Sequence, residues 1–139
     1  MNIQGINIGV VGLGYVGLPV LSLFSRKYNC KGLDVDEFRI QQLSSGIDEK
    51  DCLSPTEVST TMQRCTISSS WKNLADCNFY VVTVPTPIDN KKQPDTTALE
   101  KACLSLSQII STGDIIIFES TVYPGATEEL CIPFLESGS

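Results

Sequence analysis

The sequence contains no histidine among its 139 residues. A histidine general base, a Ser-His-Asp triad and a histidine-ligated metal are therefore excluded within this chain. No apolar run approaches the roughly 18 residues of a membrane-spanning helix, and the N-terminus lacks the pattern of a secretory signal peptide. We therefore expect no metal, no membrane partner and, by default, a cytoplasmic location.

Basic residues are also scarce. Ten Lys and Arg stand against 16 Asp and Glu, which gives a net charge of −6 without any basic cluster. Nucleic acids and anionic membranes are therefore not expected as partners. The six cysteines include no C-x-x-C pair, and most lie within apolar segments. This pattern favours buried reduced thiols over a disulfide framework.

Three glycines near the N-terminus have the spacing Gly12-x-Gly14-x-x-Gly17, directly after an apolar run. This spacing is typical of a dinucleotide-binding turn from a strand into a helix. Gly12 permits the tight turn, Gly14 has no side chain to keep phosphates away, and Gly17 lets the helix pack closely on the strand. The N–H groups near Tyr15 and Val16 can then donate to pyrophosphate oxygens.

Alone, this spacing is a weak signal, because a structural glycine turn can have it too. Here a second expected strand, 30–34, ends in Asp34, which follows Gly12 by 22 residues. A carboxylate at that place can accept hydrogen bonds from the adenosine ribose and would repel a 2′-phosphate, so we expect NAD rather than NADP. The alternative interpretation is a structural glycine turn and an aspartate that lies on the surface without binding a cofactor. Arg39 complicates the choice, because it could accept a 2′-phosphate, stack beside the adenine or simply face water.

Strand-like and helix-like segments alternate along the chain, which indicates a parallel sheet with crossover helices. The expected strands are 6–11, 30–34, 65–68, 79–84 and 114–119, and the expected helices are 15–28, 36–45, 56–64, 95–111 and 127–135, with a short turn or helix at 71–77. Ser54 would cap the third of these helices, with Pro55 at its first position. We expect an α/β fold, a Rossmann-like doubly wound parallel sheet whose sixth strand is missing at the C-terminus. Residues 1–139 would then be one NAD-binding domain, the N-terminal fragment of a longer enzyme.

Hydroxyl side chains lie in two loops that follow expected strands. Ligands bind at the carboxyl ends of strands in open parallel sheets, which is where both loops would lie. In one loop Pro85 and Pro87 flank Thr86 and stiffen its backbone. In the other, Ser120 and Thr121 follow a buried strand and would face the nucleotide crevice. A rigid turn and hydroxyls that bond only to the backbone are equally open interpretations.

Three segments of the chain read GLGYVGLP at 12–19, VTVPTPID at 82–89 with Pro94-Asp95 after it, and ESTVYPGATEE at 119–129. They resemble segments of the UDP-glucose/GDP-mannose dehydrogenase family. The likeness runs in order over nearly the whole chain. The residues of the second and third segments are most similar to those of the branch that acts on UDP-N-acetylhexosamines, such as UDP-N-acetylmannosamine or UDP-N-acetylglucosamine 6-dehydrogenases.

The resemblance implies a four-electron oxidation in two steps, in which the sugar 6-hydroxyl becomes an aldehyde and then a carboxylate while two NAD are reduced. It places the backbone of Val16 at the pyrophosphate, Asp34 at the adenosine ribose and Arg39 along the adenosine. Thr86 would touch the cofactor from its loop. Thr121 would lie near the nicotinamide, as the one catalytic candidate of this chain, and help to order a water or the reacting oxygen.

The family's nucleophilic cysteine, lysine and further carboxylates are expected beyond residue 139, because no cysteine here has the required glycine-rich setting. The chain alone would then hold NAD without oxidising a UDP-sugar, and the full-length enzyme would be a homo-oligomer, often serving polysaccharide synthesis. The alternatives are a fragment of a UDP-glucose 6-dehydrogenase, a non-catalytic NAD-binding module and another hydroxyacid dehydrogenase. The Ser-Thr-Val-Tyr-Pro-Gly loop argues against the module, and Pro-Thr-Pro against the hydroxyacid enzyme.

Overall fold

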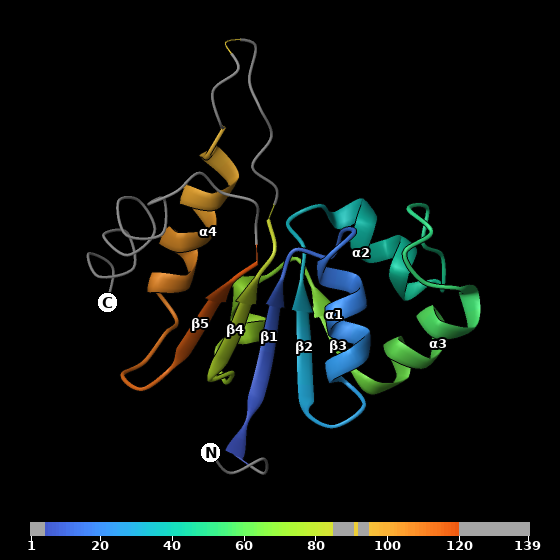
Figure 1. Ribbon diagram of the computed structural model, residues 1–139, viewed down its shortest axis with the longest axis horizontal. Coiled ribbons are helices and arrows are strands. Elements are labelled where there is room, and N and C mark those ends of the chain that lie inside the picture. The colour runs from blue at the N-terminus through green and yellow to red at the C-terminus, as the bar shows by residue number, and fades with distance from the viewer. Residues whose placement is uncertain (1–4, 85–90, 92–94, 120–139) are drawn as a thin grey trace.

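A parallel sheet forms the centre of the computed structural model, which describes residues 5–84, 91 and 95–119. The strands of this part are β1 (Asn7–Val11), β2 (Asn29–Leu33), β3 (Thr66–Ser68), β4 (Phe79–Val82) and β5 (Ile115–Phe118). They lie in the order β3-β2-β1-β4-β5, and every neighbouring pair is parallel (Figure 1). The order reverses between β1 and β4, as in a doubly wound sheet, so the expected fold class is confirmed.

Helices connect the strands on both faces of the sheet. They are α1 (Gly17–Phe24), α2 (Glu37–Ser44), α3 (Pro55–Arg64), the short 3₁₀ helix η2 (Trp71–Leu74) and α4 (Thr97–Ser107). None of these described helices is long and apolar enough to cross a membrane. The helix expected at 127–135 and the question of a sixth strand lie outside the described residues.

Helix α1 is shorter than the expected range 15–28. Val16 is its N-cap, so Gly12 and Gly14 stay outside the helix and Gly17 is its first residue. After Phe24 the chain tightens, because Arg26 N donates to the carbonyl of Leu23 and Lys27 N to that of Phe24. These three-residue bonds are typical of a 3₁₀-like helix end. The apolar periodicity continues through that end, which is why the sequence predicts a longer helix.

Helix α3 begins where the sequence predicts. Ser54 is the N-cap and Pro55 the first helical residue. The Ser54 hydroxyl accepts from Glu57 N, and the Glu57 carboxylate accepts from Ser54 N, which is a complete capping box. Proline at this position loses no helical hydrogen bond, since the first N–H groups have no partner within the helix.

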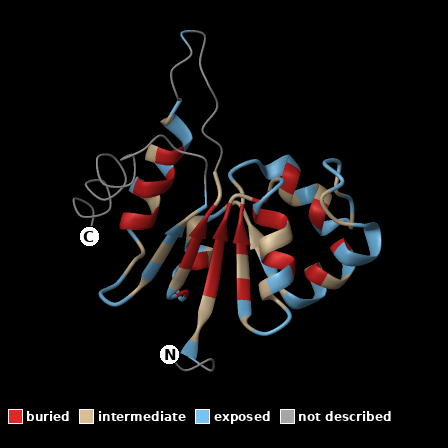
Figure 2. Ribbon diagram, viewed as in Figure 1, coloured by how far each residue is buried: buried red, intermediate tan, exposed pale blue. Residues whose placement is uncertain are grey.

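Two buried clusters, one on each face of the sheet, form the core. Val10 and Val81 pack on the side of α1, α2 and α3, whereas Val11 and Val82 face η2 and α4. Figure 2 shows the resulting band of buried residues along β1 and β4. Continuous apolar strands are the rule when both faces of a parallel sheet are covered. The sheet therefore holds its strand ends in fixed positions.

The described cysteines are all free thiols: Cys30, Cys52, Cys65, Cys77 and Cys103. The expectation of buried reduced thiols is confirmed for Cys30, Cys77 and Cys103, whereas Cys52 and Cys65 are free but only half-buried. Cys131 lies outside the described residues. Burial raises the pKa of Cys30 to about 12 and that of Cys77 to about 11, so both stay protonated at neutral pH. Since the thiolate is the nucleophilic form, neither thiol is suited to attack a substrate.

Candidate functional site

A cleft of about 1200 Å³ opens at the carboxyl ends of the central strands. Its walls come from the glycine turn after β1, the segment that follows β2, residues 83–84 after β4, most of α4, and Lys50 from the loop between α2 and α3. The cleft spans the point between β1 and β4 where the strand order reverses. Open α/β sheets bind their ligands at this point.

The glycine turn has the geometry that its spacing predicts. Gly12 has a φ of +94°, which is unfavourable for any residue with a Cβ. A Cβ added at Gly17 would overlap the Gly12 carbonyl oxygen and come 2.5 Å from Thr83 Oγ1. Gly14 is different, because its Cβ would meet only the Lys50 Nζ, at 3.8 Å. Two of the glycines thus close the turn, and the middle one leaves space beside it.

The N-terminus of α1 has no side-chain cap, whereas Asp36 caps α2 and Ser54 caps α3. The first recorded bonds of its ladder run from Leu18 N to Gly14 O and from Val20 N to Val16 O, both at 3.2 Å. The N–H groups of Tyr15 and Val16 precede this ladder. They are therefore placed to donate to an anion at the positive end of the helix.

Asp34 lies directly after β2 and is half-buried at the edge of the cleft. Its Oδ2 accepts from Leu13 N at 3.0 Å, and its Oδ1 accepts from Asp36 N at 3.0 Å. These bonds hold the carboxylate against the glycine turn. Each oxygen keeps a free lone pair, so the group can still accept from a ligand hydroxyl.

Arg39 is only 5 % exposed, so the interpretation that it simply faces water is wrong. Its Nε donates to the Leu13 carbonyl at 2.8 Å, and its Nη1 donates to Asp48 Oδ1 at 2.7 Å. Its Nη2 is buried without a hydrogen-bond partner among the described residues. Arg39 therefore supports the glycine turn from beneath and keeps one donor unused beside the cleft that it lines.

Asp48, which sequence reasoning did not single out, joins the loop between α2 and α3 to Arg39. Its side chain is 1 % exposed and also accepts from the backbone N–H groups of Lys50, Cys52 and Leu53. Burial alone would raise the pKa of Asp48, but the bonds from Arg39 and the backbone outweigh it and hold the pKa below its usual range. One acid among several in a polar loop forms no pattern, so the sequence carries no signal for this role.

Thr83 was missed as well. Its hydroxyl lies 2.9 Å from the Val11 carbonyl oxygen and 2.7 Å from that of Gly12, so it donates to the backbone at the start of the turn. Thr83 N also donates to the Val11 carbonyl, at 2.8 Å. The end of β4 thus holds the end of β1 at the floor of the cleft.

The predicted hydroxyl residues Thr86, Ser120 and Thr121 lie outside the described residues, so their roles stay predictions. In the part of the chain that the structure does describe, no group of three Cys, Asp or Glu side chains is placed to hold a metal ion.

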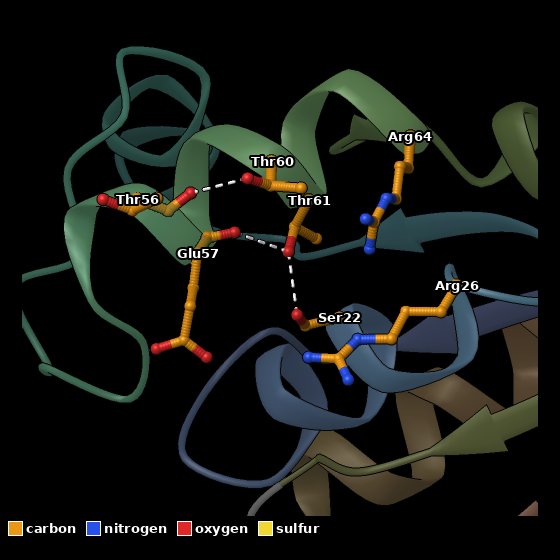
Figure 3. A pocket seen from close by; sticks show the side chains of 7 residues that line it. All are labelled: Ser22, Arg26, Thr56, Glu57, Thr60, Thr61 and Arg64. Carbon is orange, nitrogen blue, oxygen red and sulfur yellow. Dashed lines mark hydrogen bonds between the residues drawn. The ribbon is translucent and has the colours of Figure 1, made fainter.

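A second, smaller hollow of about 340 Å³ lies between α1 and α3 (Figure 3). At its centre the Thr61 hydroxyl contacts Ser22 Oγ at 2.9 Å and the Glu57 carbonyl at 2.7 Å. Arg26 and Arg64 flank it. No strand contributes to its lining, so this hollow is separate from the cleft at the strand ends.

Comparison with known proteins agrees with this geometry. The profile of the UDP-glucose/GDP-mannose dehydrogenase family, NAD binding domain, matches residues 6–139. A UDP-N-acetyl-D-glucosamine 6-dehydrogenase of Pseudomonas aeruginosa is 45% identical over 136 residues, which are 98% of this chain and 32% of the relative. The enzyme of that name from Salmonella typhi is 43% identical over 96% of this chain and 31% of its own length. The chain thus spans about a third of these curated relatives.

Solved structures show the same fold. A UDP-D-ManNAc dehydrogenase from Pyrococcus horikoshii superposes with a TM-score of 0.87 at 26% identity, over 96% of this chain and 32% of that one. A GDP-mannose dehydrogenase from Pseudomonas aeruginosa gives a TM-score of 0.85 at 25% identity, over 95% and 32%. The cofactor of this domain is NAD. The chain belongs to the UDP-glucose/GDP-mannose dehydrogenase family and carries that family's NAD-binding domain.

Proposed function

We propose that this chain is the cofactor-binding part of a nucleotide-sugar 6-dehydrogenase, which oxidises the 6-hydroxyl of a UDP-N-acetylhexosamine to a carboxylate with two NAD. The observation that carries the proposal is the cleft at the strand ends, with the uncapped N-terminus of α1 and open space beside Gly14. An anion fits there, because the turn offers N–H donors and Gly14 has no side chain to occupy the space. The relatives named for UDP-N-acetyl-D-glucosamine support the sugar class.

The described residues hold and orient the dinucleotide in this proposal. NAD supplies the hydride acceptor. The N–H groups of Tyr15 and Val16 bind its pyrophosphate beside Gly14, and Asp34 accepts from the adenosine ribose while its backbone bonds keep it in place. Arg39 supports the turn and offers its unused Nη2 on the adenosine side. Since the protein already holds these groups in place, little conformational entropy is lost when the cofactor binds.

The reacting end of the cofactor would be served by residues that the structure does not describe. Thr86 would contact the cofactor, Ser120 would lie at the crevice, and Thr121 would help to order a water or the reacting oxygen near the nicotinamide. The nucleophilic cysteine, the lysine and the further carboxylates would come from outside this chain. A cytoplasmic location and a homo-oligomeric full-length enzyme also stay predictions.

Titration with NAD and with NADP tests the placement of the cofactor. We expect the chain to bind NAD at least about tenfold more tightly, because the Asp34 carboxylate repels a 2′-phosphate. Asp34→Asn should narrow this preference, and Asp51→Asn, an exposed acid outside the cleft lining, should leave it unchanged. Equal or tighter binding of NADP by the unaltered chain would contradict the assignment of Asp34 to the ribose.

Two observations test the proposed enzyme. The 139-residue chain, mixed with NAD and UDP-N-acetylglucosamine, should produce no NADH, and turnover would show that the reaction does not need groups outside it. The gene should encode a glycine-flanked cysteine about one domain after residue 139. A stop codon directly after residue 139 would instead favour a non-catalytic NAD-binding module. A UDP-glucose 6-dehydrogenase would be distinguished by the sugar that the complete protein oxidises.

A further inference from the structure

Lys50 lies beside the glycine turn although it belongs to a distant loop. Its Nζ is 3.8 Å from the place that a Cβ on Gly14 would occupy, and 5.3 Å from the centre of the Tyr15 ring. Its side chain lines the cleft. The ammonium group is therefore next to the open side of the turn, where the pyrophosphate is proposed to lie.

Buried contacts hold the loop that carries Lys50. Its backbone N donates to Asp48 Oδ1 at 3.1 Å, and Asp48 is bound to Arg39, which in turn donates to the Leu13 carbonyl of the glycine turn. Asp48 and Arg39 are both nearly inaccessible to solvent. The backbone of Lys50 is thus connected to the turn through two buried side chains. This connection keeps the start of the Lys50 side chain close to Gly14, although the side chain itself is exposed.

The Lys50 charge has no acidic partner in the described part of the chain. The salt bridges recorded for residues 5–84, 91 and 95–119 are Lys31–Asp76 and Arg39–Asp48. The Lys50 ammonium group contacts the face of the Tyr15 ring, an interaction worth little at an exposed site. A flexible ammonium group with this freedom can turn toward an anion at small energetic cost.

We propose that Lys50 is a cofactor-binding residue that donates to the pyrophosphate of NAD beside Gly14, together with the backbone donors of the glycine turn. The proposal rests on the proposed function, because it needs the pyrophosphate beside Gly14. The turn supplies directed N–H groups, which set the orientation of the phosphates. Lys50 adds a positive charge, and charge-assisted bonds are stronger than those between neutral groups.

The test compares Lys50→Met with the unaltered chain for three ligands: NAD, ADP and adenosine. NAD and ADP carry the two linked phosphates and should bind about tenfold more weakly to the variant, as expected for the loss of one charge-assisted bond. Adenosine has no phosphate and should bind equally well to both. Lys50→Arg should recover most of the affinity. Lys72→Met, which removes an exposed lysine outside the cleft, is the matched control.

The outcomes separate this proposal from the function on which it rests. If the unaltered chain binds NAD and ADP, and Lys50→Met binds them as well as Lys72→Met does, the role of Lys50 is overturned and the proposed function stands. An equal loss for adenosine would also overturn it, because the substitution would then have disturbed the loop. If the unaltered chain binds neither NAD nor ADP, both proposals fail. Equal melting temperatures of the two methionine variants would show that the fold is intact.

Discussion

At the scale of single residues, Gly17 and Gly14 belong to one motif but are constrained in different ways. Gly17→Ala would push a methyl group into the Gly12 carbonyl and the Thr83 hydroxyl, so α1 would have to move away from the turn. We expect a loss of about 3 kcal/mol in the free energy of unfolding, measured by urea denaturation. A variant as stable as the unaltered chain would contradict the close contact between α1 and the turn.

Gly14→Ala is the matched comparison. The added methyl group meets only the flexible end of Lys50, so we expect stability within about 1 kcal/mol of the unaltered chain. NAD should nevertheless bind more weakly by calorimetric titration, because the methyl group occupies the space beside the turn. Unchanged affinity would argue that the pyrophosphate lies elsewhere. Together the two variants separate a glycine needed for folding from one needed for the ligand.

Asp48 is expected to matter far more for stability than its surface counterpart Asp76. Asp48→Asn leaves the buried Arg39 charge uncompensated and should destabilise the fold by about 3 kcal/mol. Asp76→Asn breaks an exposed pair with Lys31 and should cost less than about 1 kcal/mol. Urea denaturation of both variants gives the comparison. Similar losses would contradict the proposed difference between the buried and the exposed pair.

Asp48 should also make the stability of the fold depend on pH. Because the pKa of Asp48 is lowered below 3.8 in the folded chain, the unfolded chain binds its proton first as the pH falls. The stabilisation by Asp48 is therefore complete well above pH 4 and is lost as the pH falls from about 4 through the lower folded pKa. The stability difference between the unaltered chain and Asp48→Asn should shrink over this range. A constant difference down to about pH 2 would contradict the lowered pKa.

At the scale of elements, a hydrogen bond inside the α1–α3 contact is expected to couple the two helices. Thr61→Val removes the donor from the buried Ser22 hydroxyl and should cost about 1–2 kcal/mol, measured by urea denaturation. Adding Ser22→Ala should cost little more, because the unpaired oxygen then disappears. The loss in the free energy of unfolding should thus be smaller for the double variant than the sum of the losses for the two single variants. Strict additivity would show that the bond does not link α1 to α3.

The start of α3 and the presence of β1 and β4 follow from local sequence. Ser54 and Pro55 predict the start of α3, because the cap involves atoms within a few residues. The apolar runs predict β1 and β4, since both faces of these strands are covered. The far end of α1 could not be placed, because helical periodicity and the 3₁₀-like turn after Phe24 look alike in sequence.

At the scale of the whole molecule, NAD is expected to stabilise the fold. A ligand that binds only the folded chain adds about 2.7 kcal/mol at a concentration one hundred times its Kd. The melting temperature should therefore rise by several degrees in a fluorescence or calorimetric scan. NADP at the same concentration should raise it less. Equal shifts for the two dinucleotides would contradict the selection by Asp34 across the cleft.

The sequence by itself determined the sheet, the turn and the cofactor class. The glycine spacing and Asp34 are read locally, because steric limits on the backbone and the acid at a strand end depend on few neighbours. Only the tertiary structure decided how the turn is supported. Arg39 meets Leu13 across 26 residues, Thr83 meets Gly12 across 71, and Lys50 comes to lie beside Gly14. Arg39 lies in α2, Thr83 at a strand end and Lys50 in a loop. No local sequence pattern marks them as partners of the turn, because the packing of the whole domain brings them there.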